Sequence, residues 1–248
     1  YCYNPELIEL KPKYSISEEE VLSFLNSRKG KLEAVVITGG EPTLHNDLFG
    51  FIEKVRSMGY LVKLDTNGSI PSMIEKAISE GYVDYIAMDV KAPPEKYGIV
   101  TGSDISMDKI MKSITLIKDS GIDYEFRTTA VRSLITVKDF EKIGEMIDSA
   151  KRYVIQQIQP GKTTLDSRFT NERRYTNEEI EEIKRVAKEA ALDLAMSSKT
   201  GTSEEYWVVR EVTAGDRGGS PSSTVFLDID INTPVVTNGT EWGLDATD

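Results

Sequence analysis

The residues best suited to chemistry stand where short apolar runs of the sequence end. One run ends in Thr38-Gly39-Gly40-Glu41-Pro42, where two glycines would let a ligand approach the backbone and a carboxylate follows directly. Glu41 would suit a cationic group of that ligand. The alternative is a glycine-rich turn with a solvated glutamate, and this segment alone slightly favours the alternative.

Two further apolar runs also end in polar residues. The segment Leu64-Asp65-Thr66-Asn67-Gly68 precedes a helical pattern, so its Asn-Gly pair fits a strand-to-helix loop better than a hairpin. Asp65 is either a ligand-binding acid or a helix cap. In Ala87-Met88-Asp89-Val90-Lys91 the two charged residues are two positions apart and share one face of a strand. Burying them is costly unless they pair or meet a ligand, which favours a functional interpretation.

A fourth candidate, Arg127, interrupts the apolar run from Tyr124 to Val131. An interior guanidinium needs a carboxylate partner, so a structural ion pair and a ligand contact suit this position equally well. The sequence has one histidine, His45, and one cysteine, which excludes a His-based metal cluster. It also lacks a G-x-S-x-G nucleophile elbow and a Walker phosphate loop.

Helical patterns alternate with the apolar runs along the chain. After Ser17 a helix begins with a capping box that includes Glu20, and it ends before Gly30. Strands are predicted at 33–38, 61–66, 84–90, 124–131 and 153–159. Further helices are predicted at 46–58, 71–80, 104–120, 136–149 and 177–191, and a short apolar run at 192–196 follows the last of them. Strands joined by single helices run parallel, which predicts an α/β fold, either an open barrel or a doubly wound sheet. In both folds ligands lie at the carboxyl ends of the strands, where the motifs stand.

Composition narrows the class of protein. With 248 residues and 39% hydrophobic residues the chain can form one main domain. The net charge of -11 disfavours a nucleic-acid partner, because phosphate binding needs clustered Lys and Arg. We expect no membrane association, since the sequence has neither an apolar run of about 18 residues nor a signal peptide. A single cysteine fits a reducing compartment, and we expect a cytoplasmic protein.

The segment 199–248 differs from the rest of the chain. It carries three basic and nine acidic residues, and it contains both tryptophans. Two runs, 206–212 and 224–231, fit either strands of a small β appendage or a flexible tail. No chemistry is assigned to this acidic segment.

In order and spacing, five features of the sequence together resemble the radical S-adenosylmethionine (SAM) superfamily. They are the N-terminal run Tyr1-Cys2-Tyr3-Asn4-Pro5, the three polar motifs at 38–42, 64–68 and 87–91, and Arg127. The signature of that family is C-x3-C-x2-C, and Cys2 matches its third position. The resemblance implies a partial (β/α)6 TIM-like barrel of the radical SAM type over residues 1–198, lacking its first strand, with an irregular tail at 199–248. It places the first two cysteines upstream of Tyr1, so we expect the chain as given to be inactive.

The resemblance also implies roles for the site residues. In this family three thiolates hold a [4Fe-4S] cluster that binds SAM, and reduction of SAM gives a 5'-deoxyadenosyl radical. Cys2 would be a cluster ligand, Glu41 would accept the SAM ammonium, and Lys91 and Arg127 would contact its carboxylate or ribose. The cofactor-binding residues implied in this way are Gly39, Gly40, Glu41, Pro42, Asp65, Thr66, Asn67, Asp89, Lys91 and Arg127.

Three segments, 2–8, 39–44 and 91–97, look most like activating enzymes of anaerobic ribonucleoside-triphosphate reductase and pyruvate formate-lyase. Such an enzyme would have a glycyl-radical enzyme as its protein substrate and a reductant such as flavodoxin or ferredoxin. Two alternatives remain open. One is a radical SAM enzyme that acts on a small molecule, as in modified-nucleoside biosynthesis, and the other is a barrel without a cluster that serves as a binding module.

Overall fold

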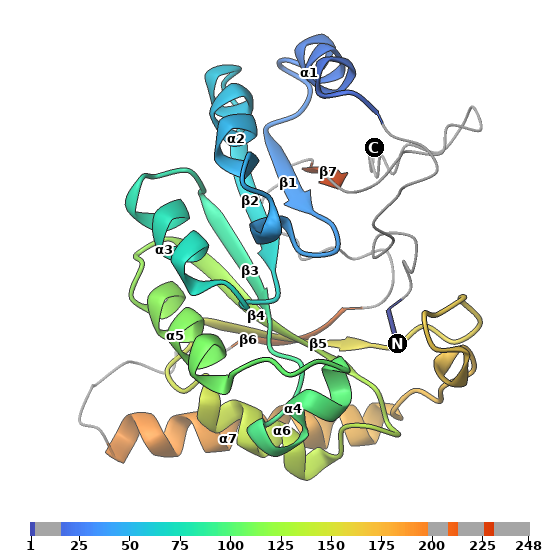
Figure 1. Cartoon of the computed structure of the whole chain (residues 1–248). Helices are drawn as coiled ribbons and strands as arrows, with labels where there is room; N and C mark the ends of the chain where they lie inside the picture. Colours follow the sequence, from blue (N-terminus) through green and yellow to red (C-terminus); the bar gives the residue numbers. More distant parts are fainter. Residues whose placement is uncertain (3–15, 198–207, 213–225, 231–248) are drawn as a thin grey trace.

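The computed structural model describes residues 1–2, 16–197, 208–212 and 226–230, and its strands form one parallel sheet (Figure 1). The strand order is β6-β5-β4-β3-β2-β1-β7, so the central five strands follow one another in chain order. Because β6 and β7 form the two ends of this order, the sheet is open. The strands are β1 (Ala34–Thr38), β2 (Leu61–Thr66), β3 (Tyr85–Asp89), β4 (Asp123–Ala130), β5 (Arg152–Gln157), β6 (Val208–Val212) and β7 (Phe226–Asp230).

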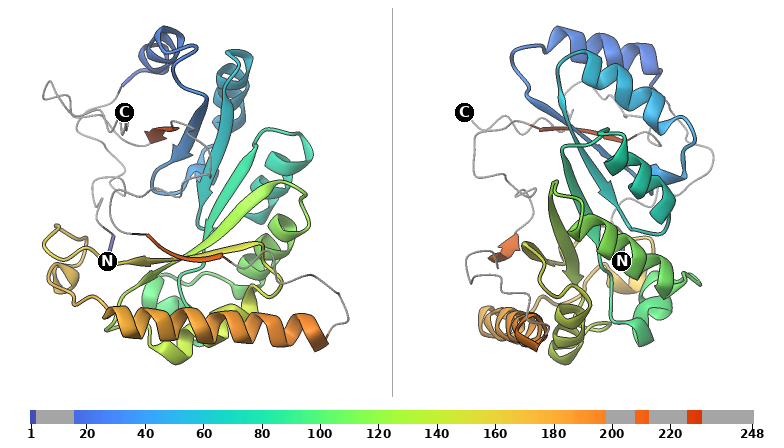
Figure 2. Two further views of the ribbon diagram at one scale, coloured as in Figure 1. Left: turned by 180° about the vertical axis from the view of Figure 1, so that it is seen from behind. Right: turned by 90° about the vertical axis from the view of Figure 1, so that its left-hand side faces the viewer.

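Helices cover the outer face of the curved sheet, which both views of Figure 2 show as a layer on one side of the strands. The helices are α1 (Glu18–Ser27), η2 (Pro42–Leu44), α2 (Leu48–Ser57), α3 (Pro71–Ser79), α4 (Pro94–Thr101), α5 (Met107–Lys118), α6 (Val137–Met146), η3 (Ser167–Phe169) and α7 (Asn177–Ser197). The α/β architecture and the parallel sheet predicted from the sequence are therefore confirmed.

The hydrophobic core lies between the sheet and this helical layer. Alternate residues of β1 to β5 point outward and are buried against the helices, as the period of two in a strand requires. The outward residues of β1 to β5 include Val35, Ile37, Val62, Leu64, Ile86, Met88, Phe126, Tyr153 and Ile155. Their helical counterparts include Ile52, Val55, Ile74, Ile114, Ile117, Phe140, Ile143 and Ile183.

The other set of alternate residues faces the concave side of the sheet and is polar over β2 to β4. The register pairs Asp65 with Ala87 and Asp89 with Arg127 across neighbouring strands. Charged side chains from three strands therefore meet on the inner face, near the carboxyl ends where the sequence predicted a ligand site.

Several predicted elements agree with the structure in type and nearly in bounds. The strand predicted at 61–66 is β2, and the capping box of Ser17 and Glu20 begins α1. The Asn67-Gly68 pair lies in the loop between β2 and α3 and not in a hairpin, as predicted.

Other elements differ from the prediction. Helix α4 was not predicted, and it begins at the second of two consecutive prolines, Pro93 and Pro94, where a fixed φ suits the first helical turn. Helix α7 does not end at residue 191 but continues to Ser197 through the short apolar run that was expected to follow it.

The C-terminal segment contributes two described strands. Strand β6 pairs with β5 and β7 pairs with β1, both in parallel. They fall within the runs 206–212 and 224–231, for which strand and flexible tail were the alternatives. The N-terminal residues 3–15 and the remaining residues of the segment 198–248 lie outside the described residues, and the division at residue 198 stays a prediction.

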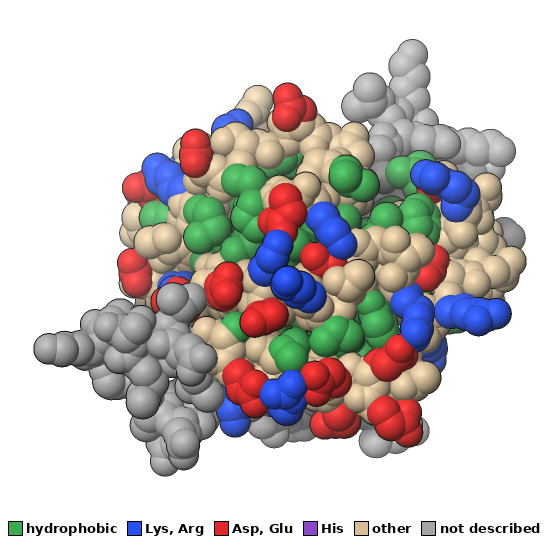
Figure 3. Space-filling view, turned by 90° about the horizontal axis from the view of Figure 1, so that it is seen from below, with side chains coloured by type: hydrophobic (Ala, Val, Ile, Leu, Met, Phe, Trp, Pro, Cys, Tyr) green, Lys and Arg blue, Asp and Glu red, His purple; other side chains and the backbone are tan. Residues whose placement is uncertain are grey.

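The surface seen from below in Figure 3 carries acidic and basic side chains side by side, with apolar side chains between them. No continuous basic stripe crosses the part of this face that is described, in keeping with the net charge of -11. Among the described helices, none is long and apolar enough to cross a bilayer.

Helices α6 and α7 approach each other closely at Gly144, where a Cβ atom would lie 2.5 Å from the carbonyl oxygen of Ala187. We expect Gly144→Ala to lower the free energy of unfolding by about 1–3 kcal/mol, because the helix backbones must move apart. Gly50→Ala on α2 is the matched control, since a Cβ there meets nothing within 4 Å. It should leave stability unchanged or raise it by up to about 1 kcal/mol. Urea unfolding monitored by circular dichroism measures both, and equal effects would contradict the helix-contact interpretation.

Candidate functional site

The Glu41 carboxylate connects the ends of β1 and β2. Its Oε1 accepts hydrogen bonds from the backbone and hydroxyl of Thr43 and, at 2.8 Å, from the Thr66 hydroxyl. Its Oε2 accepts one from the Asn67 backbone at 2.6 Å. Glu41 is only 4% exposed, so the alternative of a solvated glutamate was wrong. Burial raises its pKa, and the hydrogen bonds from Thr43, Asn67 and Thr66 offset part of that rise.

The loop after β2 is held from several sides. Thr66 Oγ1 accepts a hydrogen bond from the backbone of Gly68 at 3.1 Å, and Ser113 on α5 donates one to the Gly68 carbonyl at 2.7 Å. Gly68 has a φ of +75°, and a Cβ atom there would lie 2.1 Å from the side chain of Met88. The backbone conformation favours glycine at this position, and a Cβ atom there would displace the end of the Met88 side chain.

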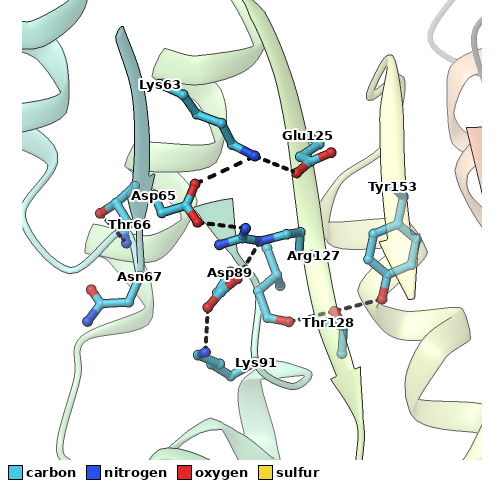
Figure 4. A network of polar contacts seen from close by, with 12 residues as sticks. Lys63, Asp65, Thr66, Asn67, Asp89, Lys91, Glu125, Arg127, Thr128 and Tyr153 are labelled. Carbon is cyan, nitrogen blue, oxygen red and sulfur yellow. Dashed lines mark hydrogen bonds and ion pairs between the residues drawn. The ribbon is translucent and has the colours of Figure 1, made fainter. Parts of the chain in front are cut away.

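Arg127 bridges two carboxylates on the concave face of the sheet. Its NH1 atom lies 2.9 Å from Asp65 Oδ2, and its Nε atom lies 2.9 Å from Asp89 Oδ1 (Figure 4). The three side chains come from β4, β2 and β3 respectively. The ion pair that was one of the two alternatives for Arg127 is therefore present, and Arg127 has two carboxylate partners.

Lys91 extends the same network toward the end of β3. Its Nζ atom lies 2.6 Å from Asp89 Oδ2, and the two side chains are each about one quarter exposed. Burial alone would raise the pKa of Asp89, but the positive charges of Arg127 and Lys91 outweigh burial and hold this pKa well below its usual range. Burial opposes the charged form of Lys91, yet Asp89 keeps the pKa of Lys91 above its usual value. Asp89, Lys91 and Arg127 are therefore all charged at neutral pH.

Two tyrosine hydroxyl groups lie near Lys91. The Tyr97 hydroxyl lies 3.5 Å from the Lys91 backbone nitrogen, and burial raises the pKa of Tyr97 to about 12. The Tyr1 hydroxyl is buried and interacts electrostatically with Lys91 and Asp89. Burial raises the pKa of Tyr1. Cys2 follows it, half-buried, and its carbonyl accepts a hydrogen bond from Leu165 at 2.8 Å.

Comparison with known proteins identifies the family. A protein-family model described as the radical SAM superfamily matches residues 1–151. The chain belongs to the radical SAM superfamily. It is 32% identical over 210 residues to a protein of Methanocaldococcus jannaschii named as a glycyl-radical enzyme activating enzyme, covering 82% of this chain and 85% of that protein.

Other relatives have different names. The 7-carboxy-7-deazaguanine synthase of Thermococcus kodakarensis is 25% identical over 158 residues, which span 61% of this chain and 58% of the synthase. A solved domain of a pyruvate-formate lyase-activating enzyme from Bacteroides vulgatus superposes with a TM-score of 0.51 at 15% identity. That likeness covers 74% of this chain and 99% of the domain, and it supports the radical SAM fold.

The residues of this radical SAM chain that the sequence singled out fall into two linked groups. Asp65, Asp89, Lys91 and Arg127 form the ion-pair network, while Glu41 binds Thr66 and Asn67. The groups meet because Asp65, Thr66 and Asn67 are consecutive. The alternative of a helix cap at Asp65 was wrong, since Asp65 lies within β2 and Ile70 precedes α3. Gly39 (φ +146°), Gly40 and Pro42 form the loop that carries Glu41.

The sequence prediction missed four polar residues that extend this network on the side of Asp65 away from Asp89. Lys63 Nζ lies 3.8 Å from Asp65 Oδ1 and 3.4 Å from Glu125 Oε1. The Tyr85 hydroxyl donates to Glu125 Oε2 at 3.2 Å, and Arg152 donates to Tyr85 at 2.7 Å. Lys63 and Glu125 each stand two positions before a predicted site residue on the same strand, and this period of two was the available signal.

The residues present do not fit an iron-sulfur cluster, which the family implies. A cluster of this kind needs three thiolates, and the sequence contains one cysteine. Within the described residues no group of three or more His, Cys, Asp or Glu side chains could hold a metal ion.

Thr66 joins Glu41 to the loop after β2, so we expect Thr66→Val to lower the free energy of unfolding by about 1–3 kcal/mol, the usual cost of unsatisfied buried polar groups. Thr66→Ser retains the hydroxyl and should recover most of this loss. Thr115→Val removes an exposed hydroxyl from α5 and is the control, with little effect expected. Urea unfolding of the three variants measures the differences. A Thr66→Val variant as stable as the wild type would show that the link is dispensable.

Proposed function

We propose that residues 1–198 are the SAM-binding barrel of a glycyl-radical enzyme activating enzyme. The observation that carries this proposal is the juxtaposition, at the carboxyl ends of neighbouring strands, of buried carboxylates with Lys91 and Arg127. The methionine part of SAM carries an ammonium and a carboxylate on one carbon. A site with both charge signs close together suits such a group.

We assign the contact with the SAM ammonium to the carboxylate of Glu41. Three hydrogen bonds reach its Oε1 atom, whereas one hydrogen bond within the described residues reaches Oε2. A carboxylate oxygen has two lone pairs, so Oε2 retains the capacity to accept from an ammonium. Gly39 and Gly40 precede it and allow close approach of the ligand, and Pro42 begins the turn that fixes the loop.

We assign the contact with the SAM carboxylate to the ammonium group of Lys91. Arg127 already donates to Asp65 and Asp89 through two of its nitrogens. Lys91 donates to one carboxylate, Asp89, and an ammonium has three donors. Lys91 is also the more exposed of the two cations, with 26% of its side chain accessible against 14% for Arg127.

A protein substrate is favoured by the relative from M. jannaschii, because the similarity extends over 85% of that protein's length. The proposed partner is a glycyl-radical enzyme. The synthase from T. kodakarensis, together with relatives named as GTP 3',8-cyclases, makes a small-molecule substrate the competing proposal. We favour the protein substrate because these relatives match this chain at lower identity and over less of their own length.

Radical chemistry in this family draws its electron from a [4Fe-4S] cluster with three thiolate ligands, and of these the sequence supplies one, Cys2. We propose that flavodoxin or ferredoxin supplies that electron. The sequence supplies one thiolate, so activity has to be tested in a form of the protein to which the other two cluster thiolates are supplied. SAM binding by the barrel residues can be tested with the chain as it stands.

We expect Lys91→Met to weaken SAM binding by roughly 10- to 100-fold, the range that corresponds to losing a charge-assisted hydrogen bond. Lys112→Met removes a lysine from an exposed ion pair with Glu75 and should leave the affinity unchanged. Equilibrium dialysis with radiolabelled SAM gives both dissociation constants. If Lys91→Met binds as tightly as the wild type, the assignment of Lys91 to the ligand carboxylate is wrong.

For the activity itself, we expect a form of the protein that carries three cluster thiolates, reconstituted without oxygen, to cleave SAM to 5'-deoxyadenosine on reduction. With an anaerobic ribonucleotide reductase or pyruvate formate-lyase present, electron paramagnetic resonance should detect a glycyl radical. SAM cleavage without that signal, but with turnover of a nucleoside precursor, would favour the small-molecule alternative. No SAM cleavage at all would exclude both enzymatic functions.

A further inference from the structure

Six side chains of alternating charge form a continuous line along the concave face of the sheet (Figure 4). The successive ion-pair distances are 3.4, 3.8, 2.9, 2.9 and 2.6 Å. In order from the interior to the end of β3 the residues are Glu125, Lys63, Asp65, Arg127, Asp89 and Lys91. Three carboxylates and three cations balance, so the line as a whole is neutral.

The inner end of this line is more deeply buried than the outer end. The Lys63 side chain is 7% exposed and the Glu125 side chain 1%, whereas Asp89 and Lys91 are about one quarter exposed. Glu125 also accepts from Tyr85, which is in turn bound by Arg152. The inner end is thus fixed to β3 and β5, while the outer end faces the proposed ligand.

Asp65 is the residue at which the inner and outer halves meet. Its Oδ2 atom accepts from Arg127, but its buried Oδ1 atom accepts no hydrogen bond within the described residues. Lys63 Nζ lies 3.8 Å from that oxygen, close enough for an ion pair although too far for a hydrogen bond. Within the described residues, Lys63 is therefore the cation that faces Asp65 Oδ1, while Arg127 binds Asp65 Oδ2.

We propose that Lys63 is a positioning residue for the SAM site: its charge balances Asp65, so that Arg127 is shared between Asp65 and Asp89 and Lys91 remains oriented toward the ligand. This inference rests on the proposed function, because Lys91 is taken as the SAM contact. Lys63 itself would touch neither SAM nor substrate.

The two members of the buried Lys63–Glu125 ion pair should therefore differ in their effect on SAM binding. If Lys63 is removed, three carboxylates face two cations and the line has a net charge of -1. Asp65 then draws Arg127 away from Asp89. Asp89 then holds Lys91 as its main cation and competes with the ligand for it. Without the Glu125 charge, Lys63 still faces Asp65, and the outer half of the line is unaffected.

The experiment compares Lys63→Met with Glu125→Gln, two variants that break the same Lys63–Glu125 pair. We expect Lys63→Met to raise the dissociation constant for radiolabelled SAM about tenfold, because a buried charge loses its partner. Glu125→Gln should stay within about threefold of the wild type. Lys54→Met, which removes an exposed lysine paired with Glu18, is the control for loss of a lysine. Equal weakening by Lys63→Met and Glu125→Gln would mean that the pair is merely structural, and unchanged binding by Lys63→Met would overturn the proposal.

A second measurement needs no ligand. The Nε–H group of Arg127 donates to Asp89, so its signal in a ¹H–¹⁵N correlation spectrum reports the bond that Lys63 is proposed to maintain. We expect this signal to shift or broaden in Lys63→Met and to stay in place in Glu125→Gln. An unchanged signal in Lys63→Met overturns the inference whatever the affinity. If the wild type fails to bind SAM, the proposed function is at fault, and the Arg127 signal still decides the role of Lys63.

Discussion

The ion pairs of Arg127 with Asp65 and Asp89 fix the relative positions of three strands. A guanidinium on the inner face of β4 meets carboxylates from β2 and β3 at 2.9 Å each. A slip of one residue would turn Arg127 onto the outer face, among the apolar side chains of the core. Removing one partner of a buried pair typically costs about 3–5 kcal/mol, so the register of the central sheet and the shape of the site are set together.

The sequence predicted the parts of the fold that depend on local patterns. The bounds of β2 and the capping box of α1 follow from apolar runs and from single residues, and both match the structure. Helix α4 was missed because consecutive prolines read locally as a loop, although Pro94 at the first helical position is favourable. The extension of α7 to Ser197 was missed because a short apolar run does not distinguish strand from helix.

The candidate site could be located from sequence, but its connections could not. Glu41, Asp65, Asp89 and Arg127 were singled out because each stands in or after an apolar run. The contacts of Lys63 with Asp65 and Glu125 depend on the register between β2, β3 and β4, which no single segment encodes. Burial likewise decided between two interpretations of Glu41, since a glycine-rich turn fits a solvated and a buried glutamate equally well.

The hydrogen bonds around Thr66 and Gly68 have a thermodynamic consequence for any ligand of this site. Glu41, the loop after β2 and helix α5 are already joined in the free chain, through Thr66, Asn67 and Ser113. A ligand that enters such a site does not have to order the loop, so less of its interaction energy is lost as conformational entropy. Selectivity would then come from shape and charge that exist before binding, and a molecule that requires the loop to open would be rejected.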